Sequence, residues 1–77
     1  MKQAHTIEEV KALKDSTRPV VFLWSAAWCP DCVYLVPFLD RIEADNPEFD
    51  FYKLDRDELL DEAIDQDILG IPSFTVF

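Results

Sequence analysis

Residues 20–32 read VVFLWSAAWCPDC, and this stretch decides the fold. Its first five residues form a continuous apolar run of β-branched and aromatic side chains, which is typical of a central strand covered on both faces. Its end holds the only two cysteines of the chain, Cys29 and Cys32, with Pro30 and Asp31 between them. Proline suits the first position of a helix, because its fixed φ is helical and its missing N–H would have no partner there. The stretch therefore predicts a strand that leads into a helix, with both cysteines in the opening turn of that helix.

The rest of the chain alternates in the same way. Thr6 and Glu9 form a capping-box pattern at the start of a short amphipathic helix that ends near Lys14. Later apolar runs, separated by turn signals, predict two more strands and one more helix. Six elements are expected, in the order helix, strand, helix, strand, helix, strand: residues 6–14, 20–24, 30–45, 49–54, 58–67 and 73–77. This alternation predicts an α/β sandwich.

The second and third predicted helices each carry an apolar stripe that should face the sheet. The residues expected to be buried are Val33, Leu35, Val36, Leu39 and Ile42 in the second helix, and Leu59, Leu60, Ala63 and Ile64 in the third. Pro37 removes one hydrogen bond from the second helix and is expected to kink it. Asp57 is a plausible N-cap for the third helix.

Composition and charge exclude several classes of function. The 77 residues are 49% hydrophobic and carry a net charge of −9, which argues for one globular domain and against nucleic-acid binding or docking on an anionic membrane. Residues 40–67 hold twelve acids and three bases, which indicates either solvated faces or a partner-selecting acidic surface. No apolar run reaches the ~18–20 residues of a membrane span, and the polar start is no signal peptide, so we expect a cytoplasmic protein.

The cysteine pair admits three kinds of site. A structural disulfide would close a loop of about four residues and stabilise the fold by only about 2 kcal/mol, and such bridges are rare in reducing compartments. A structural zinc site requires four ligands. The chain has only two cysteines and one histidine, His5, which lies far away in the sequence. Zinc or an iron–sulfur cluster would therefore have to be shared between two subunits. A redox-active dithiol fits best, because residues i and i+3 of a first helical turn lie at disulfide distance with little backbone movement.

The two thiols should differ in acidity. Cys29 is expected at the N-cap, where free backbone N–H groups and the positive end of the helix dipole favour the thiolate and lower its pKa. Cys32 is expected one turn further in, more buried and less acidic. Asp31 should oppose the Cys29 thiolate by its charge. We therefore expect Cys29 to attack a disulfide and Cys32 to resolve the mixed disulfide, with Pro30 and Asp31 tuning the couple.

Two separate motifs resemble the thioredoxin family. Residues 27–32 (AWCPDC), followed by Pro37, match its redox motif, and residues 70–73 (GIPS) match its distant proline turn. The resemblance covers residues 6–77. It implies a single domain, residues 1–77, built as a three-layer sandwich with a central mixed sheet flanked by helices. It also implies a cis peptide bond before Pro72, and an apolar substrate groove around Cys29 formed by Trp28, Ile71 and Pro72.

The sequence departs from the family pattern in three places. Pro30-Asp31 stands where thioredoxins typically carry Gly-Pro. Leu23 stands where the family has a buried aspartate that handles the proton of the resolving cysteine, so Lys53, the usual neighbour of that acid, is expected to extend to solvent. The chain stops at Phe77 within an apolar run, before the family's last strand and helix. We therefore expect a C-terminally truncated domain, or another chain covering this edge.

These observations together predict a cytoplasmic thiol–disulfide oxidoreductase, a protein-disulfide reductase. Its expected partners are disulfide-containing proteins or small molecules, and a thiol reductase or thiol pool that resets the dithiol; no metal, organic cofactor, nucleic acid or membrane is required. Two alternatives stay open. One is a glutaredoxin-like, glutathione-linked reductase, although no basic pocket for glutathione carboxylates is evident. The other is a non-catalytic binding module that keeps the thioredoxin fold.

Overall fold

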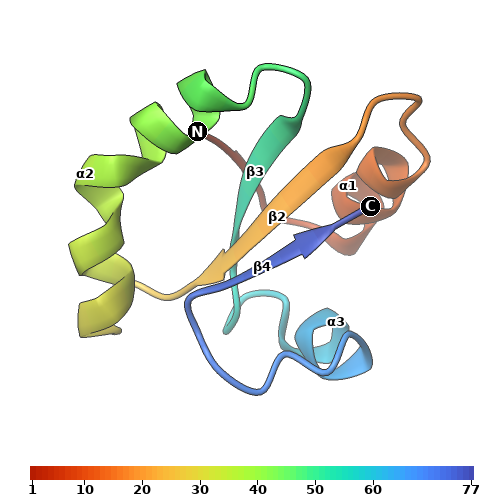
Figure 1. Ribbon diagram of the computed structural model, residues 1–77. Coiled ribbons are helices and arrows are strands. Elements are labelled where there is room, and N and C mark those ends of the chain that lie inside the picture. Colours follow the sequence, from red (N-terminus) through yellow and green to blue (C-terminus); the bar gives the residue numbers. More distant parts are fainter.

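The computed structural model describes residues 1–77 and contains four strands and three helices (Figure 1). In chain order these are β1 (Lys2–Ala4), α1 (Ile7–Lys14), β2 (Val20–Ser25), α2 (Pro30–Asp45), β3 (Asp50–Asp55), α3 (Leu60–Asp65) and β4 (Ser73–Val76). None of the three helices combines the length and apolar character needed to cross a bilayer. The alternation of helices and strands predicted from the sequence is confirmed.

The four strands form one mixed sheet in the order β1-β3-β2-β4. Strands β1, β3 and β2 are parallel, and β2 pairs with β3 in register from Val20 opposite Asp50 to Ser25 opposite Asp55. Strand β4 runs antiparallel to β2 and forms one edge of the sheet, and β1 forms the other. All six residues of β2 are buried, as the continuous apolar run predicts. Strands β2 and β3 therefore end side by side.

Helices cover both faces of this sheet, which gives the expected three-layer sandwich (Figure 1). Helices α1 and α3 lie on one face and α2 lies on the other. The main core lies on the α1/α3 face, and its buried residues are Ala4, Val10, Val20, Phe22, Trp24, Leu54, Leu59 and Ala63. Because side chains alternate along a strand, Val21 and Leu23 of β2 face α2. The redox motif therefore follows a strand that is packed on both sides.

Strand β1 was not predicted. Two of its three residues, Lys2 and Gln3, are exposed, and only Ala4 is buried. The strand forms because β3 offers it a partner, with Lys2 opposite Tyr52 and Ala4 opposite Leu54. A polar edge segment of three residues has no hydrophobic pattern that could announce it.

Helix α2 has the predicted bounds, but part of its predicted stripe is wrong. Cys32 and Leu39 are buried, and Leu35 and Ile42 are half-buried, whereas Val33 and Val36 are exposed. At 100° per residue, Val33 lies on the far side of the helix from the buried residues and Val36 lies at the margin of their stripe. The helix is continuous through Pro37.

Helix α3 is shorter than predicted, and its predicted cap and inner face need correction. The Asp55 carboxylate accepts the backbone N–H groups of Asp57 and Glu58, at 2.8 and 3.3 Å, so a turn occupies the expected first helical positions. Asp57 therefore does not cap the helix, which begins only at Leu60. Leu59 and Ala63, four residues apart, are buried as expected. The other two residues expected to face inward are exposed: Leu60 and Ile64.

Candidate redox site

The site begins where β2 ends. Residues 26–28 connect β2 to Cys29, which is the N-cap of α2 with an extended backbone, φ −86° and ψ 117°. Its N–H donates to the Ala26 carbonyl at 3.2 Å, and its carbonyl accepts the first bond of the helix, from the Val33 N–H, at 3.0 Å. Pro30 occupies the first helical turn, as predicted. The strand thus delivers Cys29 directly to the helix N-terminus.

Cys29 and Cys32 are both free thiols, 7% and 6% exposed, and form a small apolar cluster with Ala26. Ile71 packs against this cluster, although it lies 42 residues after Cys29. The Cys29 thiol donates to the Ile71 carbonyl at 3.8 Å. The Ile71–Pro72 peptide bond is cis. The structure therefore brings the two sequence motifs together around one sulfur atom.

The two thiols have opposite pKa shifts. The backbone N–H of Cys32 and then its thiol donate to Cys29 and lower the pKa of Cys29, while burial and the Asp31 carboxylate act in the other direction. Burial raises the pKa of Cys32, and the negative charges of Cys29 and Asp31 add to this effect. The outer thiol is therefore the more acidic one, as the sequence predicts. Every group that lowers the pKa of Cys29 belongs to the opening turn of α2.

Trp28 lies at the surface beside the thiols. Its side chain is 60% exposed, which excludes a role in the core. The indole Nε1–H donates to Oδ2 of Asp57 at 2.6 Å, and the Arg56 guanidinium lies over the ring, 5.4 Å from its centroid. Arg56 also donates to Oδ1 of Asp57 at 3.2 Å. The bond from Trp28, and then Arg56, hold the pKa of the Asp57 carboxyl below its usual range.

Sequence reasoning missed Arg56 and Asp57 as neighbours of the site. Both follow β3 directly, and β3 ends beside β2 in the parallel sheet. Side chains that follow neighbouring parallel strands meet at the same edge of the sheet. The signal that could have identified them is the parallel pairing of β2 and β3. It places residues 56 and 57, which follow β3, at the same edge of the sheet as Trp28.

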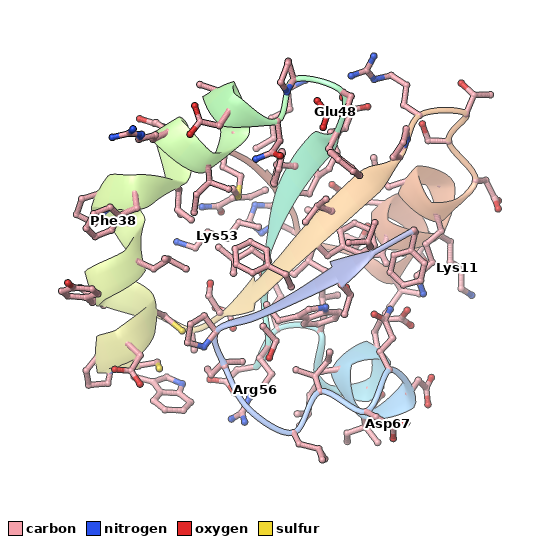
Figure 2. The ribbon with its side chains drawn as sticks, viewed as in Figure 1. Lys11, Phe38, Glu48, Lys53, Arg56 and Asp67 are labelled. Carbon is pink, nitrogen blue, oxygen red and sulfur yellow. The ribbon has the colours of Figure 1, made fainter.

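Leu23 of β2 lies opposite Lys53 of β3 in the sheet. Leu23 stands where the family carries its buried aspartate, so Lys53 lies beside the position of that acid, as expected. Leu23 is buried, and the only buried polar residues of the chain are Ser25 and Glu62, so no buried carboxylate takes the place of the family's aspartate. Lys53 lies between β3 and α2 (Figure 2) and lines a cavity of about 180 Å³ with His5, Asp55 and Glu58 among its neighbours. It is half-buried rather than fully extended to solvent.

The fold and the site define a protein with a vicinal dithiol at a helix N-terminus of an α/β sandwich, facing a proline turn. No group of three or more His, Cys, Asp or Glu side chains is arranged to hold a metal ion. The Thioredoxin family model matches residues 3–77, and the chain belongs to this family. The resemblance inferred from the two motifs is confirmed.

Known relatives support the same assignment. The chain is 32% identical over 74 residues to an H-type thioredoxin of Brassica campestris, covering 91% of this chain but only 60% of that protein. It is 32% identical over 75 residues to thioredoxin-1 of Saccharomyces cerevisiae, covering 97% and 73%. A solved thioredoxin of Plasmodium falciparum shares the fold, with a TM-score of 0.92, 23% identity, and coverage of 100% of this chain and 76% of that one.

Proposed function

We propose that this chain is a thiol–disulfide oxidoreductase that reduces disulfide bonds in proteins or small molecules. One observation carries the proposal: two free thiols with opposite pKa shifts share the first turn of α2, and the outer thiol contacts the Ile71 carbonyl of the proline turn. Membership of the thioredoxin family supports it. We propose further that residues 1–77 act as one thioredoxin-like domain.

The proposed reaction has two exchange steps. The Cys29 thiolate attacks one sulfur of the substrate disulfide, forms a mixed disulfide, and releases the other substrate sulfur as a thiolate that takes up a proton. The Cys32 thiol then loses its proton and attacks the Cys29 sulfur, which releases the second substrate thiol. The substrate gains two electrons and two protons, and the protein is left with a Cys29–Cys32 disulfide. A thiol reductase or a thiol pool must return two electrons to reset it.

The residues around Cys29 have proposed roles of their own. Trp28, Ile71 and Pro72 form the groove that receives the substrate, because the backbone of Ile71, beside a proline that has no N–H, can pair with an extended substrate strand. Pro30 starts the helix that makes the Cys29 thiolate more stable. Asp31 tunes the couple by opposing that thiolate. No residue of this set needs a metal or an organic cofactor for the reaction.

A turnover assay tests the proposal. The chain should accelerate the reduction of a protein disulfide by dithiothreitol, and Cys29→Ser should abolish the acceleration. Cys32→Ser should accumulate the mixed disulfide with substrate, which mass spectrometry detects, because the resolving thiol is gone. Equal rates for the wild type and Cys29→Ser would refute catalysis and leave a thioredoxin-fold binding module. We also propose a cytoplasmic location, since a dithiol that works as a reductant must be kept reduced.

A further inference from the structure

Arg56 is the basic side chain that contacts the tryptophan of the proposed groove. Its guanidinium lies 5.4 Å from the centroid of the Trp28 ring, and the Trp28 side chain is largely exposed. Figure 2 shows Arg56 beyond the end of β3, at the same end of the molecule as the start of α2. Its backbone is fixed, because its N–H donates to the Ser25 carbonyl at 2.9 Å. Arg56 is therefore held beside the groove by the sheet itself.

The guanidinium of Arg56 has hydrogen-bonding capacity left over. It carries five N–H donors, and the structure gives it one bond, to Oδ1 of Asp57. Its Nε is shielded from solvent and has no partner. A shielded donor without an acceptor is unfavourable, so Asp57 leaves the guanidinium incompletely satisfied. The side chain as a whole is 30% exposed, so a ligand can reach it.

The other basic side chains that form ion pairs do so away from the groove. Lys14 pairs with Glu62, Arg18 with Asp50, and Arg41 with Asp45. The chain carries a net charge of −9, so its overall field repels an acidic substrate. Arg56, although paired on one side with Asp57, places a positive charge next to Trp28. Its effect should therefore depend on where a negative charge lies in the substrate.

We infer that Arg56 is a specificity-determining residue that binds a carboxylate close to the reacting cysteine of the substrate strand. The inference rests on the proposed function and names the substrate class that the groove favours: peptide disulfides flanked by Glu or Asp. Arginine suits this task because its planar fork matches a carboxylate, and its remaining donors are not used within the protein.

Matched peptide disulfides test the inference. The two peptides of a pair are identical except at one position, where one carries Glu and the other Gln. The varied position is one of the two residues before or the two residues after the reacting cysteine. The reduced protein is mixed with each peptide in turn. The second-order rate constants give a Glu:Gln ratio for every position. In at least one position we expect Arg56→Gln to lower this ratio about two- to fivefold, the effect of a partly exposed ion pair. Arg41→Gln, which makes the same change of net charge at the far end of α2, should leave the ratio unchanged. Arg56→Lys should keep part of the preference.

The outcomes separate this inference from the proposed function. If no peptide is reduced faster than by Cys29→Ser, the proposed function fails. If all peptides are reduced but the ratio is the same in the wild type and Arg56→Gln at every position, the inference is overturned and the function stands. An equal change in Arg41→Gln would assign the effect to net charge and overturn it too. So would an equal loss of rate on both peptides of each pair, which would indicate a structural role. Reduction of glutathione disulfide is measured in parallel, and Arg56 dependence of that rate alone would overturn the acidic-peptide class.

Discussion

Replacing Lys14 by methionine should destabilise the fold through Glu62, its partner across the α1/α3 layer. The Lys14 ammonium donates to Oε1 of Glu62, and the Glu62 side chain is only 11% exposed. The same ammonium lies 4.9 Å from the centroid of the Phe77 ring. Methionine keeps the apolar stem of the lysine but deletes the charge. Glu62 would then keep one donor, Nε2 of Gln66, at 2.7 Å.

The expected loss is about 1.5–3 kcal/mol. Removing one partner of a fully buried pair costs about 3–5 kcal/mol, because the other charge stays buried and uncompensated. The Lys14 side chain is 27% exposed, so water can approach the carboxylate, and we reduce this term to about 1–2 kcal/mol. Loss of the cation–π contact with Phe77 adds about 0.5–1 kcal/mol. Such a loss is a large share of the stability of a 77-residue chain.

Urea unfolding followed by far-UV circular dichroism measures this loss, and its pH dependence has a definite sign. The bond from Lys14 holds the pKa of Glu62 below its ordinary value. The stability that the carboxylate contributes is therefore present above its unfolded pKa of about 4.3 and is lost as the pH falls through the lower folded value. In Lys14→Met the bond from Lys14 is gone, so burial should raise the pKa of Glu62 instead. Protonation of Glu62 in acid then removes the cost of burying an unpaired charge. The difference in the free energy of unfolding between wild type and Lys14→Met should therefore become smaller as the pH falls.

Lys11→Met is the matched control, because it makes the same chemical change at an exposed position of the same helix. It should cost less than about 0.5 kcal/mol. A loss for Lys14→Met no larger than that of the control, or a loss that stays constant from neutral pH into acid, would refute the reasoning.

Three further predictions concern the thiols and the edge strand. Alkylation of the reduced protein, followed by peptide mapping against pH, should give Cys29 a midpoint below the ~8.5 of a free thiol and Cys32 a midpoint above it; the reverse order would contradict the pKa directions. Asp31→Asn should move the Cys29 midpoint further down, since it removes an opposing charge and keeps the Asp31 backbone N–H, which helps to lower the pKa of Cys29; an upward shift would contradict this. Thr75→Val should lower the free energy of unfolding in urea by about 1–3 kcal/mol. The reason is that the buried Trp24 Nε1–H, which donates to Oγ1 of Thr75 at 3.2 Å, loses its acceptor. A loss below about 0.5 kcal/mol would show that this bond contributes little.

The strand and helix around the cysteines could be predicted because their signals are local. An apolar run marks β2, and α2 begins at Pro30 and ends before Asn46-Pro47, so its bounds follow from the residues that flank it. The same holds for the cap of α1, where the Thr6 side chain accepts the Glu9 N–H as expected. In these places the local pattern and the tertiary fold favour the same structure.

The rest depends on contacts between distant parts of the chain. Glu62 reads as a surface residue, and it is buried only because Lys14, 48 residues away, supplies its counter-charge. Leu59, just before α3, and Ala63 within it are buried, whereas Ile64 is exposed. The neighbours of Trp28 likewise come from the end of another strand. No pattern within one segment contains this information.

The position of β4 separates two properties of the dithiol. The groups that make Cys29 acidic all lie in the first turn of α2, whereas Ile71 reaches Cys29 from the segment that leads into β4. Strand β4 is an edge strand, paired only with β2. Local opening of this edge would carry the proline turn away and leave the helix intact. Such an opened molecule would still have a nucleophilic sulfur, but it would no longer align a partner chain against that sulfur. Partner selection can therefore be lost while the nucleophilicity of Cys29 is kept.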